Sequence, residues 1–366
     1  MLFQIAFAIL LSSILLFTGC GSKEAGGSNS GGVDRYVTCD NFPASPSGTN
    51  AIIGGKAVTP ESWVAKSSVL LVMLVKITDP KTGEVSRKSS QCTGVLVDRD
   101  VILTAAHCVA SVVGRREVLA TKAFFDSQPY CNSTKNLILS SGVSVTRTAI
   151  HPKYNGLMEP MPWESETEFG DLALLKLQQR APSSWIRVKL SEEQVSLRGQ
   201  NILAAGYGTI VSNVNVEDMS LAILRFVELK GILDQTANEL DAHFKMEAQE
   251  ALTNNSNLTV KDKKDIQMIQ SKQTVFETGI NHDFLYVDQS EGKGICSGDS
   301  GGAAFFQKNG RYYAVGIASW GGNSKDPVNL CSSIGGYTNV RRYKSWINDT
   351  FNSLKSPDSQ VNNVFE

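Results

Sequence analysis

Three separate segments of the chain hold residue types that together could cut an acyl bond. Ser300 lies in Gly298-Asp299-Ser300-Gly301-Gly302, where glycines allow a sharp turn and bring backbone N–H groups close to whatever the hydroxyl attacks. His107 follows an apolar run, and its imidazole could take the serine proton near neutral pH. Asp171 precedes the apolar run 172–177, where a carboxylate could accept the imidazole N–H. Each residue alone has an ordinary structural explanation, but together they predict nucleophilic catalysis.

The elements that must position these side chains are predicted to be mostly β-strands. The chain has 366 residues, of which 42% are hydrophobic and 19% charged, so it can bury a substantial core. Short β-branched and apolar runs at 68–77, 93–97, 101–104 and 172–177 recur between turn signals, which is typical of an all-β barrel or sandwich. The net charge is −1, so no excess of charge points to nucleic acid as a partner.

One segment departs from this β pattern. Between 233 and 275, apolar residues three or four apart fall on one helical face, namely Leu233, Ala237, Leu240, Phe244, Ala248 and Leu252. After the polar break 254–257, Thr259 and Asp262 resemble a capping box that would start a second helix. We therefore expect an inserted helical hairpin, which is either an enlarged surface loop with its own small core or a site for a protein partner.

The N-terminal residues indicate export and a flexible tether. The first 17 residues are almost wholly apolar and run into Thr18-Gly19-Cys20, which resembles a bacterial lipoprotein signal in which Cys20 carries the lipid and anchors the chain to a membrane. A plain cleaved signal and an uncleaved membrane helix are the alternatives, and all three place the rest of the chain outside the cytoplasm. The Gly- and Ser-rich segment 21–32 has the composition of a flexible tether.

The order His107, Asp171, Ser300, with the sequences around them, resembles the chymotrypsin/trypsin family of serine endopeptidases. Further motifs match this family in order along the chain: Ile52-Ile53-Gly54-Gly55, 150–155, Gly206-Tyr207-Gly208, Ser319-Trp320-Gly321, Tyr337-Thr338-Asn339-Val340 and Ser345-Trp346-Ile347. The resemblance implies an all-β fold of two packed antiparallel barrels with a C-terminal helix, and it places the helical insertion in the second barrel.

The resemblance also divides the chain into segments. Residues 1–19 are expected to be the signal peptide, 20–51 the tether and pro-segment, 52–351 the protease domain, and 352–366 a C-terminal tail. The insertion 233–275 lies within the protease domain.

The activity implied by the resemblance is peptide-bond hydrolysis through an acyl-enzyme. His107 would deprotonate Ser300, Asp171 would orient His107, and the backbone N–H groups of Gly298 and Ser300 would hold the oxyanion. The substrates would be proteins or peptides, and neither a metal nor a cofactor is required. The alternatives are a non-catalytic homologue that binds a partner and an esterase that uses the same triad on small esters.

The resemblance also places a primary specificity pocket, whose base lies six residues before the nucleophile, at Gly294. The implied pocket residues are Gly294, Ile295, Ser319, Trp320, Gly321 and Gly335. Because none of them is charged, and an unpaired buried cation is costly, we expect cleavage after apolar residues rather than after Arg or Lys, with large or small size left open. The alternative is that segment 322–330 brings Asp326 within reach of the pocket.

Activation in this family follows cleavage before an Ile, which frees an amine that pairs with the acid next to the nucleophile. Ile52 and Asp299 occupy these two positions. The residue before the cut is Ala51, which argues against an activator that cuts after Arg or Lys. The alternative is a chain that is never cut here, in which Ile52 to Gly55 would be an ordinary apolar strand.

The chain has seven cysteines, and six of them plus one near the N-terminus form a pattern that oxidising compartments produce; lipid on Cys20 would leave six for disulfides. The resemblance implies the bridges Cys92–Cys108 and Cys296–Cys331. Cys39 and Cys131 are then left over, and a bridge between them would keep the pro-segment attached after cleavage. Two unpaired or otherwise paired thiols are the alternative, because connectivity does not follow from sequence.

Overall fold

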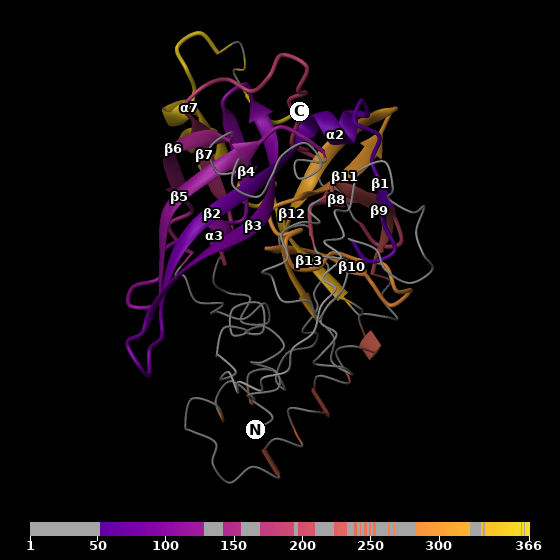
Figure 1. The fold of residues 1–366 in the computed structure, drawn as a ribbon. Helices are drawn as coiled ribbons and strands as arrows, with labels where there is room; N and C mark the ends of the chain where they lie inside the picture. Colours follow the sequence, from indigo (N-terminus) through magenta and orange to yellow (C-terminus); the bar gives the residue numbers. More distant parts are fainter. Residues whose placement is uncertain are drawn as a thin grey trace, which may run out of the picture.

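The fold was obtained as a computed structural model. It describes residues 52–127, 142–154, 169–193, 197–208, 223–232, 283–322, 331, 334–359, 361 and 363–366, and ten separate residues between 238 and 267. Within these ranges the chain forms two antiparallel β-barrels that lie side by side (Figure 1). No helix in the described part of the chain is long and apolar enough to cross a membrane.

The first barrel is closed by six antiparallel strands. In ring order they are β2 (Ser68–Thr78), β3 (Val85–Asp98), β4 (Val101–Thr104), β7 (Ala173–Leu177), β6 (Val143–Ile150) and β5 (Arg116–Phe124). The sequence of β2, SVLLVMLVKIT, is apolar on both faces over its first half, and those residues are buried on both faces. A strand covered on both sides needs such an unbroken apolar run rather than an alternating one.

The second barrel is built from seven strands. They are β1 (Lys56–Ala57), β8 (Asn201–Gly206), β9 (Arg225–Gly231), β10 (Phe284–Asp288), β11 (Ala303–Lys308), β12 (Arg311–Gly322) and β13 (Ile334–Asn339). Strand β9 pairs with both β10 and β8, which closes the ring β9-β10-β13-β12-β11-β8, and β1 adds to β9. The expectation of two antiparallel barrels is therefore confirmed.

Three short helices accompany the barrels in the described ranges. Helix α2 (Trp63–Ser67) is capped by Ser62, whose hydroxyl accepts the N–H of Ala65 at 3.2 Å. Helix α3 (Ala106–Val109) follows β4, and α7 (Lys344–Leu354) is the expected C-terminal helix, which buries one face. The ten separately described residues between 238 and 267 are helical, and the rest of the expected hairpin lies outside the described residues.

The linker between the barrels is held by both of them and by the end of the chain. The N–H of Val188 donates to Leu96 O in β3, and that of Ser191 donates to Ala314 O in β12. Leu190 exchanges backbone hydrogen bonds with the chain end, donating to Val364 O and accepting from Glu366 N, both at 2.9 Å. The segment 352–366 is therefore docked along most of its described length.

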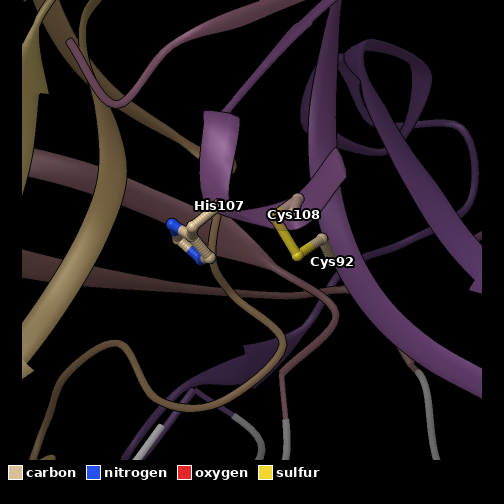
Figure 2. Close-up of side chains that lie close together, drawn as sticks. All are labelled: Cys92, His107 and Cys108. Carbon is tan, nitrogen blue, oxygen red and sulfur yellow. A yellow bond between two sulfur atoms is a disulfide. The ribbon is translucent and has the colours of Figure 1, made fainter. Parts of the chain in front are cut away.

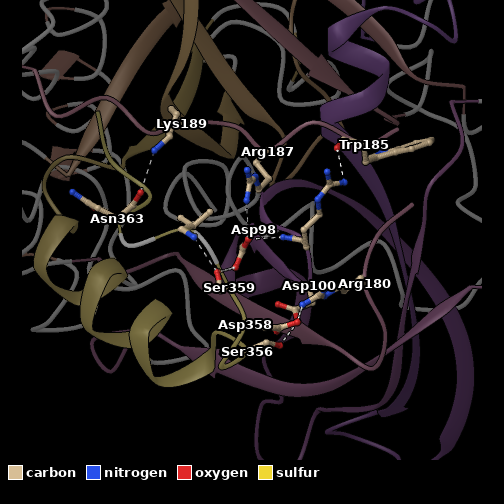
Figure 3. Close-up of polar contacts among 12 residues, drawn as sticks. Asp98, Asp100, Arg180, Trp185, Arg187, Lys189, Ser356, Asp358, Ser359 and Asn363 are labelled. Carbon is tan, nitrogen blue, oxygen red and sulfur yellow. Dashed lines mark hydrogen bonds and ion pairs between the residues drawn. The ribbon is translucent and has the colours of Figure 1, made fainter. Parts of the chain in front are cut away.

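Side chains fix the same C-terminal segment to the first barrel. The hydroxyls of Ser356 and Ser359 donate to the carboxylates of Asp100 and Asp98, which lie at the β3–β4 turn (Figure 3). Nearby, the Lys189 ammonium donates to Asn363 O at 3.2 Å. The tail expected from the sequence is thus a structured part of the fold.

The N-terminal expectations lie outside the described residues. These are the signal peptide with Cys20, the tether and pro-segment up to Ala51, and the left-over cysteines Cys39 and Cys131. Asp326, the alternative source of charge for the pocket, also lies outside them.

Candidate active site

His107 lies on α3, which is fixed to the first barrel from two sides. The residue after it, Cys108, is joined by a disulfide to Cys92 of β3, with 6.2 Å between their Cα atoms (Figure 2). From β5, the Arg116 guanidinium donates to the carbonyls of His107, Cys108 and Ala110 at 3.1, 2.7 and 2.6 Å. These bonds satisfy carbonyls that a one-turn helix leaves without intrahelical donors. The backbone of His107 is therefore well fixed, while its ring remains partly exposed.

Asp171 is fully buried and holds the His107 ring. One carboxylate oxygen lies 2.8 Å from His107 Nδ1, and the other accepts the His107 backbone N–H at 2.9 Å. The Ser319 hydroxyl donates to Asp171 Oδ2 at 2.6 Å. This arrangement favours the His107 tautomer with its proton on Nδ1, which leaves Nε2 free to accept a proton.

The same contacts set the charge of Asp171. Burial raises the pKa of the Asp171 carboxyl, but the charge of His107 and the hydrogen bonds from His107 and Ser319 outweigh burial and hold the pKa below its ordinary value. Asp171 is therefore ionised near neutral pH, beside a ring that would become positively charged on taking a proton.

Ser300 lies in a tight turn that packs against the elements around His107. The Ser300 carbonyl accepts the N–H of Thr93 at 2.8 Å, and Thr93 is next to Cys92, which bridges to the neighbour of His107. Gly301 has φ +84°, and a Cβ there would lie 2.1 Å from Thr104 Oγ1. Only glycine therefore fits after Ser300, and its absence of a side chain lets the turn approach β3 and β4.

The turn leaves two backbone donors unused. The N–H of Asp299 donates to Cys296 O, and those of Gly301 and Gly302 donate to Ala318 O and Asp299 O. The N–H groups of Gly298 and Ser300 donate to no acceptor among the residues that the structure describes. Two free N–H groups next to a serine hydroxyl can bind an oxyanion.

Asp299 is fully buried beneath this turn. Its carboxylate accepts the N–H of Gly208 and of Cys296, each at 2.8 Å. Burial raises its pKa to about 7, although these two hydrogen bonds and the charge of Arg225 act in the opposite direction. Ile52 is also fully buried and has φ +40°, which is unfavourable for a β-branched residue.

Gln289 is a residue of this region that the sequence analysis missed. It is fully buried between Gly294 and Gly335: a Cβ on Gly294 would lie 2.3 Å from its Cδ, and one on Gly335 2.5 Å from its Oε1. Its carboxamide accepts the N–H of Ile295 at 2.8 Å and donates to Cys331 O at 3.1 Å. The sequence alone does not indicate this role for Gln289. Its contact with Gly335 arises from the pairing of strands β10 and β13, which are far apart in the sequence.

The other expected pocket residues come from neighbouring strands. Gly321 pairs with Gly335 across β12 and β13. The Trp320 ring covers Gly336, where a Cβ would lie 2.3 Å from Trp320 Cε2. Ser319 turns its hydroxyl toward Asp171. The structure thus brings Gly294, Ile295 and Gly335 together around Gln289, places Gly321 opposite Gly335, and links Ser319 to the His107–Asp171 pair.

Both bridges implied by the family resemblance are present, Cys92–Cys108 and Cys296–Cys331. The first lies close to His107, so that two sulfurs and a ring nitrogen fall within 4.8 Å of one another (Figure 2). The disulfide removes the thiolates that a metal ion would need, and this cluster is therefore no metal site.

Comparison with known proteins identifies a matching family and several relatives. The family model described as Trypsin matches residues 75–240 and 241–347. The chain is 24% identical over 312 residues to CLIP domain-containing serine protease B4 of Anopheles gambiae, covering 82% of this chain and 70% of the relative. It is 24% identical over 317 residues to Melanization protease 1 of Drosophila melanogaster, covering 81% of this chain and 64% of the relative.

A shorter relative matches over more of its own length. Kallikrein 1-related peptidase b27 of Mus musculus is 28% identical over 264 residues, covering 71% of this chain and 80% of the relative. The chain thus spans about two thirds of the two insect proteins and most of the mouse peptidase.

Proposed function

This chain belongs to the trypsin family of serine proteases, and on that basis we propose that it is an endopeptidase with Ser300 as nucleophile, His107 as base and Asp171 as the orienting acid. The observation that carries the proposal is the buried, ionised Asp171 at 2.8 Å from His107 Nδ1. This contact leaves Nε2 to accept the Ser300 proton as the hydroxyl attacks the scissile carbonyl.

Charge then develops on the carbonyl oxygen of the substrate. The N–H groups of Gly298 and Ser300 would donate to this oxyanion, while His107 gives its proton to the leaving amine. Water enters next, His107 removes its proton, and the acyl-enzyme is hydrolysed to regenerate Ser300. In each of these steps the proton transfers and the stabilisation of the oxyanion are carried out by side chains and backbone groups of this chain.

The test of this proposal is active-site labelling. Matured protein is treated with a fluorophosphonate probe, the modified residue is mapped by mass spectrometry, and hydrolysis of a peptide library and of simple esters is followed in parallel. We expect labelling at Ser300 and cleavage of peptide amides, with Ser300→Ala as the unreactive control. Cleavage of esters alone would favour an esterase, and no labelling would favour a non-catalytic binding protein.

We propose that the specificity pocket accepts uncharged side chains. Gly294 supplies no charge at the base, and the carboxamide of Gln289 lies against it with its two N–H groups directed to Cys331 O and Ile295 O. A buried guanidinium or ammonium group would find no counter-charge in these residues, which makes its burial costly. Preferential cleavage after Arg or Lys in the peptide library would contradict this assignment.

We propose further that cleavage between Ala51 and Ile52 activates the enzyme by freeing an amine for Asp299. Two observations support this. Among the described residues, the buried Asp299 carboxylate accepts hydrogen bonds only from backbone N–H groups, and Ile52 has a strained backbone next to the bond that would be cut. N-terminal sequencing of the active form tests the site. Cleavage of the Ala51–Ile52 bond that leaves the activity unchanged would contradict the proposal.

The leader is proposed to direct export and lipid attachment at Cys20. Two disulfides in the described residues fit an oxidising compartment. Metabolic labelling with a radioactive fatty acid should mark the wild-type protein and not Cys20→Ser. Labelling of neither protein would favour a plain cleaved signal.

We propose separately that a disulfide joins Cys39 to Cys131. This bridge would keep residues 20–51 attached to the cut protein until a reductant is added.

For segment 233–275 we propose an enlarged surface loop rather than a partner site. Insertions in loops cost little stability, and the described residue Met246 is 60% exposed. Replacing the segment with a short Gly-Ser linker should preserve Ser300 labelling. Loss of a co-purifying protein on this deletion would instead assign it to a partner.

A further inference from the structure

Arg225 projects to the inner face of the second barrel. Along β9 the buried residues Val227 and Leu229 alternate with the exposed Glu228 and Lys230, so Arg225 shares the face of the buried set. Its Nε is buried and has no hydrogen-bond partner. Within the described part of the chain, the side chain of Arg225 makes neither an ion pair nor a hydrogen bond. Burying a donor without a hydrogen-bond acceptor costs free energy of folding. We therefore asked which buried group the charge of Arg225 could stabilise.

The register of the sheet points this charge toward Asp299. Arg225 lies directly opposite Gly206 in the β8–β9 pair. Residues directly opposite each other in an antiparallel pair project to the same face. A Cβ on Gly206 would lie 2.2 Å from Asp299 Oδ1, so the Asp299 carboxylate occupies the face toward which Arg225 projects.

The charge of Arg225 also favours the ionised form of Asp299, although burial has the larger and opposite effect. The groups in hydrogen-bond contact with Asp299 are the neutral N–H groups of Gly208 and Cys296, and Arg225 contributes the additional electrostatic stabilisation of the carboxylate. Charges interact over several ångströms in surroundings that exclude water, so direct contact is not required. A guanidinium also keeps its charge throughout the physiological pH range.

We propose that Arg225 is a positioning residue that acts as the counter-cation of Asp299 before the chain is cut, so that the uncut protein already has basal proteolytic activity. This inference rests on the proposed function of Ser300. Asp299 sits between Gly298 and Ser300, and above pH 7, where its carboxylate is ionised, it keeps the turn in the conformation that leaves both N–H groups free. Cleavage before Ile52 then adds a second cation, which raises activity and makes Arg225 dispensable.

The experiment compares cut and uncut forms of one protein. Residues 47–51 are replaced by the recognition sequence of a site-specific protease, and intact mass shows whether each sample is cut. The second-order rate constant for labelling of Ser300 by a fluorophosphonate is measured for wild type, Arg225→Gln and Arg225→Lys. Lys230→Gln, which removes a positive charge from the exposed face of the same strand, is the matched control. Thermal unfolding checks that each variant is folded.

We expect the uncut wild type to react measurably and the cut wild type to react faster. Arg225→Gln should lower the rate constant of the uncut form at least tenfold and that of the cut form less than threefold. Arg225→Lys should restore most of the uncut rate, and Lys230→Gln should change neither form. This pattern separates a charge effect from a general loss of stability, which would affect both forms.

Other results would overturn the inference. An equal loss in both forms, or an uncut wild type that does not react while the cut form does, would remove the role of Arg225 and leave the proposed function standing. A cut wild type that does not react would remove the proposed function itself, and the role of Arg225 with it.

Discussion

The Ser319 hydroxyl and the Asp171 carboxylate form a hydrogen bond of 2.6 Å that joins the two barrels at the candidate active site. Ser319 belongs to β12 of the second barrel, whereas Asp171 precedes β7 of the first. The carboxylate oxygen that accepts this bond is the one that lies next to His107 Nδ1. The orientation of His107 therefore depends on a donor from the barrel that also carries Ser300.

Ser319→Ala should lower kcat about tenfold with a smaller effect on KM. The substitution removes a hydrogen bond to a charged group, worth about 1.5–3 kcal/mol, from the acid that orients His107. Steady-state kinetics on a peptide amide measures the split. Ser319→Thr, which keeps the hydroxyl, is the matched control, and an unchanged kcat in Ser319→Ala would show that the bond is not used in catalysis.

Asp171→Asn should leave the fold intact and lower kcat by about 10⁴-fold, as the corresponding substitution does in the Ser-His-Asp triad of chymotrypsin-type proteases. The amide keeps the size of the carboxylate but donates to His107 Nδ1, which imposes the wrong tautomer. Circular dichroism verifies folding, and single-turnover hydrolysis measures the rate. A loss below tenfold would rule out the role proposed for Asp171.

Arg116→Met should destabilise the protein by about 2–3 kcal/mol and reduce kcat. The substitution leaves the carbonyls of His107, Cys108 and Ala110 without their donor, and a charged donor contributes more than a neutral one. Urea unfolding and peptide hydrolysis report the two effects. Arg115→Met removes an exposed arginine one position away and should change neither quantity.

Gln289→Ala should shift the preference of the enzyme toward larger residues before the cut. Removing the carboxamide opens the space between Gly294 and Gly335, at a cost in stability from the lost hydrogen bonds and the new cavity. A peptide library compares the preference with that of wild type. Gln289→Met, which preserves the volume, should retain the wild-type size preference; an identical shift in both variants would exclude a role of volume.

The uncut chain should lose stability as pH rises between about 4 and 7. The pKa of Asp299 is about 7 in the folded state against an ordinary value of 3.8, so in this range the folded state holds a proton that the unfolded chain has released. The free energy of unfolding then falls with pH, by at most about 1.4 kcal/mol per pH unit for one proton.

Urea unfolding of the uncut Ser300→Ala protein across this range measures the slope, since that variant cannot digest itself. Asp299→Asn in the same background removes the titrating group, and the difference between the two proteins separates Asp299 from the histidines. A difference that does not change with pH would contradict the raised pKa.

Residues in local motifs were predictable from the sequence, and residues positioned by register were not. The glycines around Ser300 and the apolar run after Asp171 act over a few residues, so their patterns indicate a turn and a buried strand directly. Arg225 and Gln289 have their roles because β8 lies opposite β9 and β10 opposite β13. Such strand pairings depend on the closed barrel, and the spacing of residues along the chain does not predict them.

The C-terminal segment illustrates the same limit. Val361, Val364 and Phe365 have the i, i+3, i+4 spacing of one helical turn, but three residues are too few to predict a helix, and the segment was expected only as a tail. In the structure all three are buried, and Val364 and Phe365 pair with Leu190 of the linker between the barrels, a contact between segments far apart in the sequence.

The attachment of that linker bears on how the protein can move. Residues 188–191 form backbone hydrogen bonds to three parts of the protein: to Leu96 in the first barrel, to Ala314 in the second barrel and to Val364 near the chain end. A linker bound on three sides cannot serve as a hinge, because opening the barrels would break backbone hydrogen bonds on each side. The two halves of the catalytic machinery therefore keep a constant alignment, and any adjustment to substrate or to activation must come from loops rather than from domain motion.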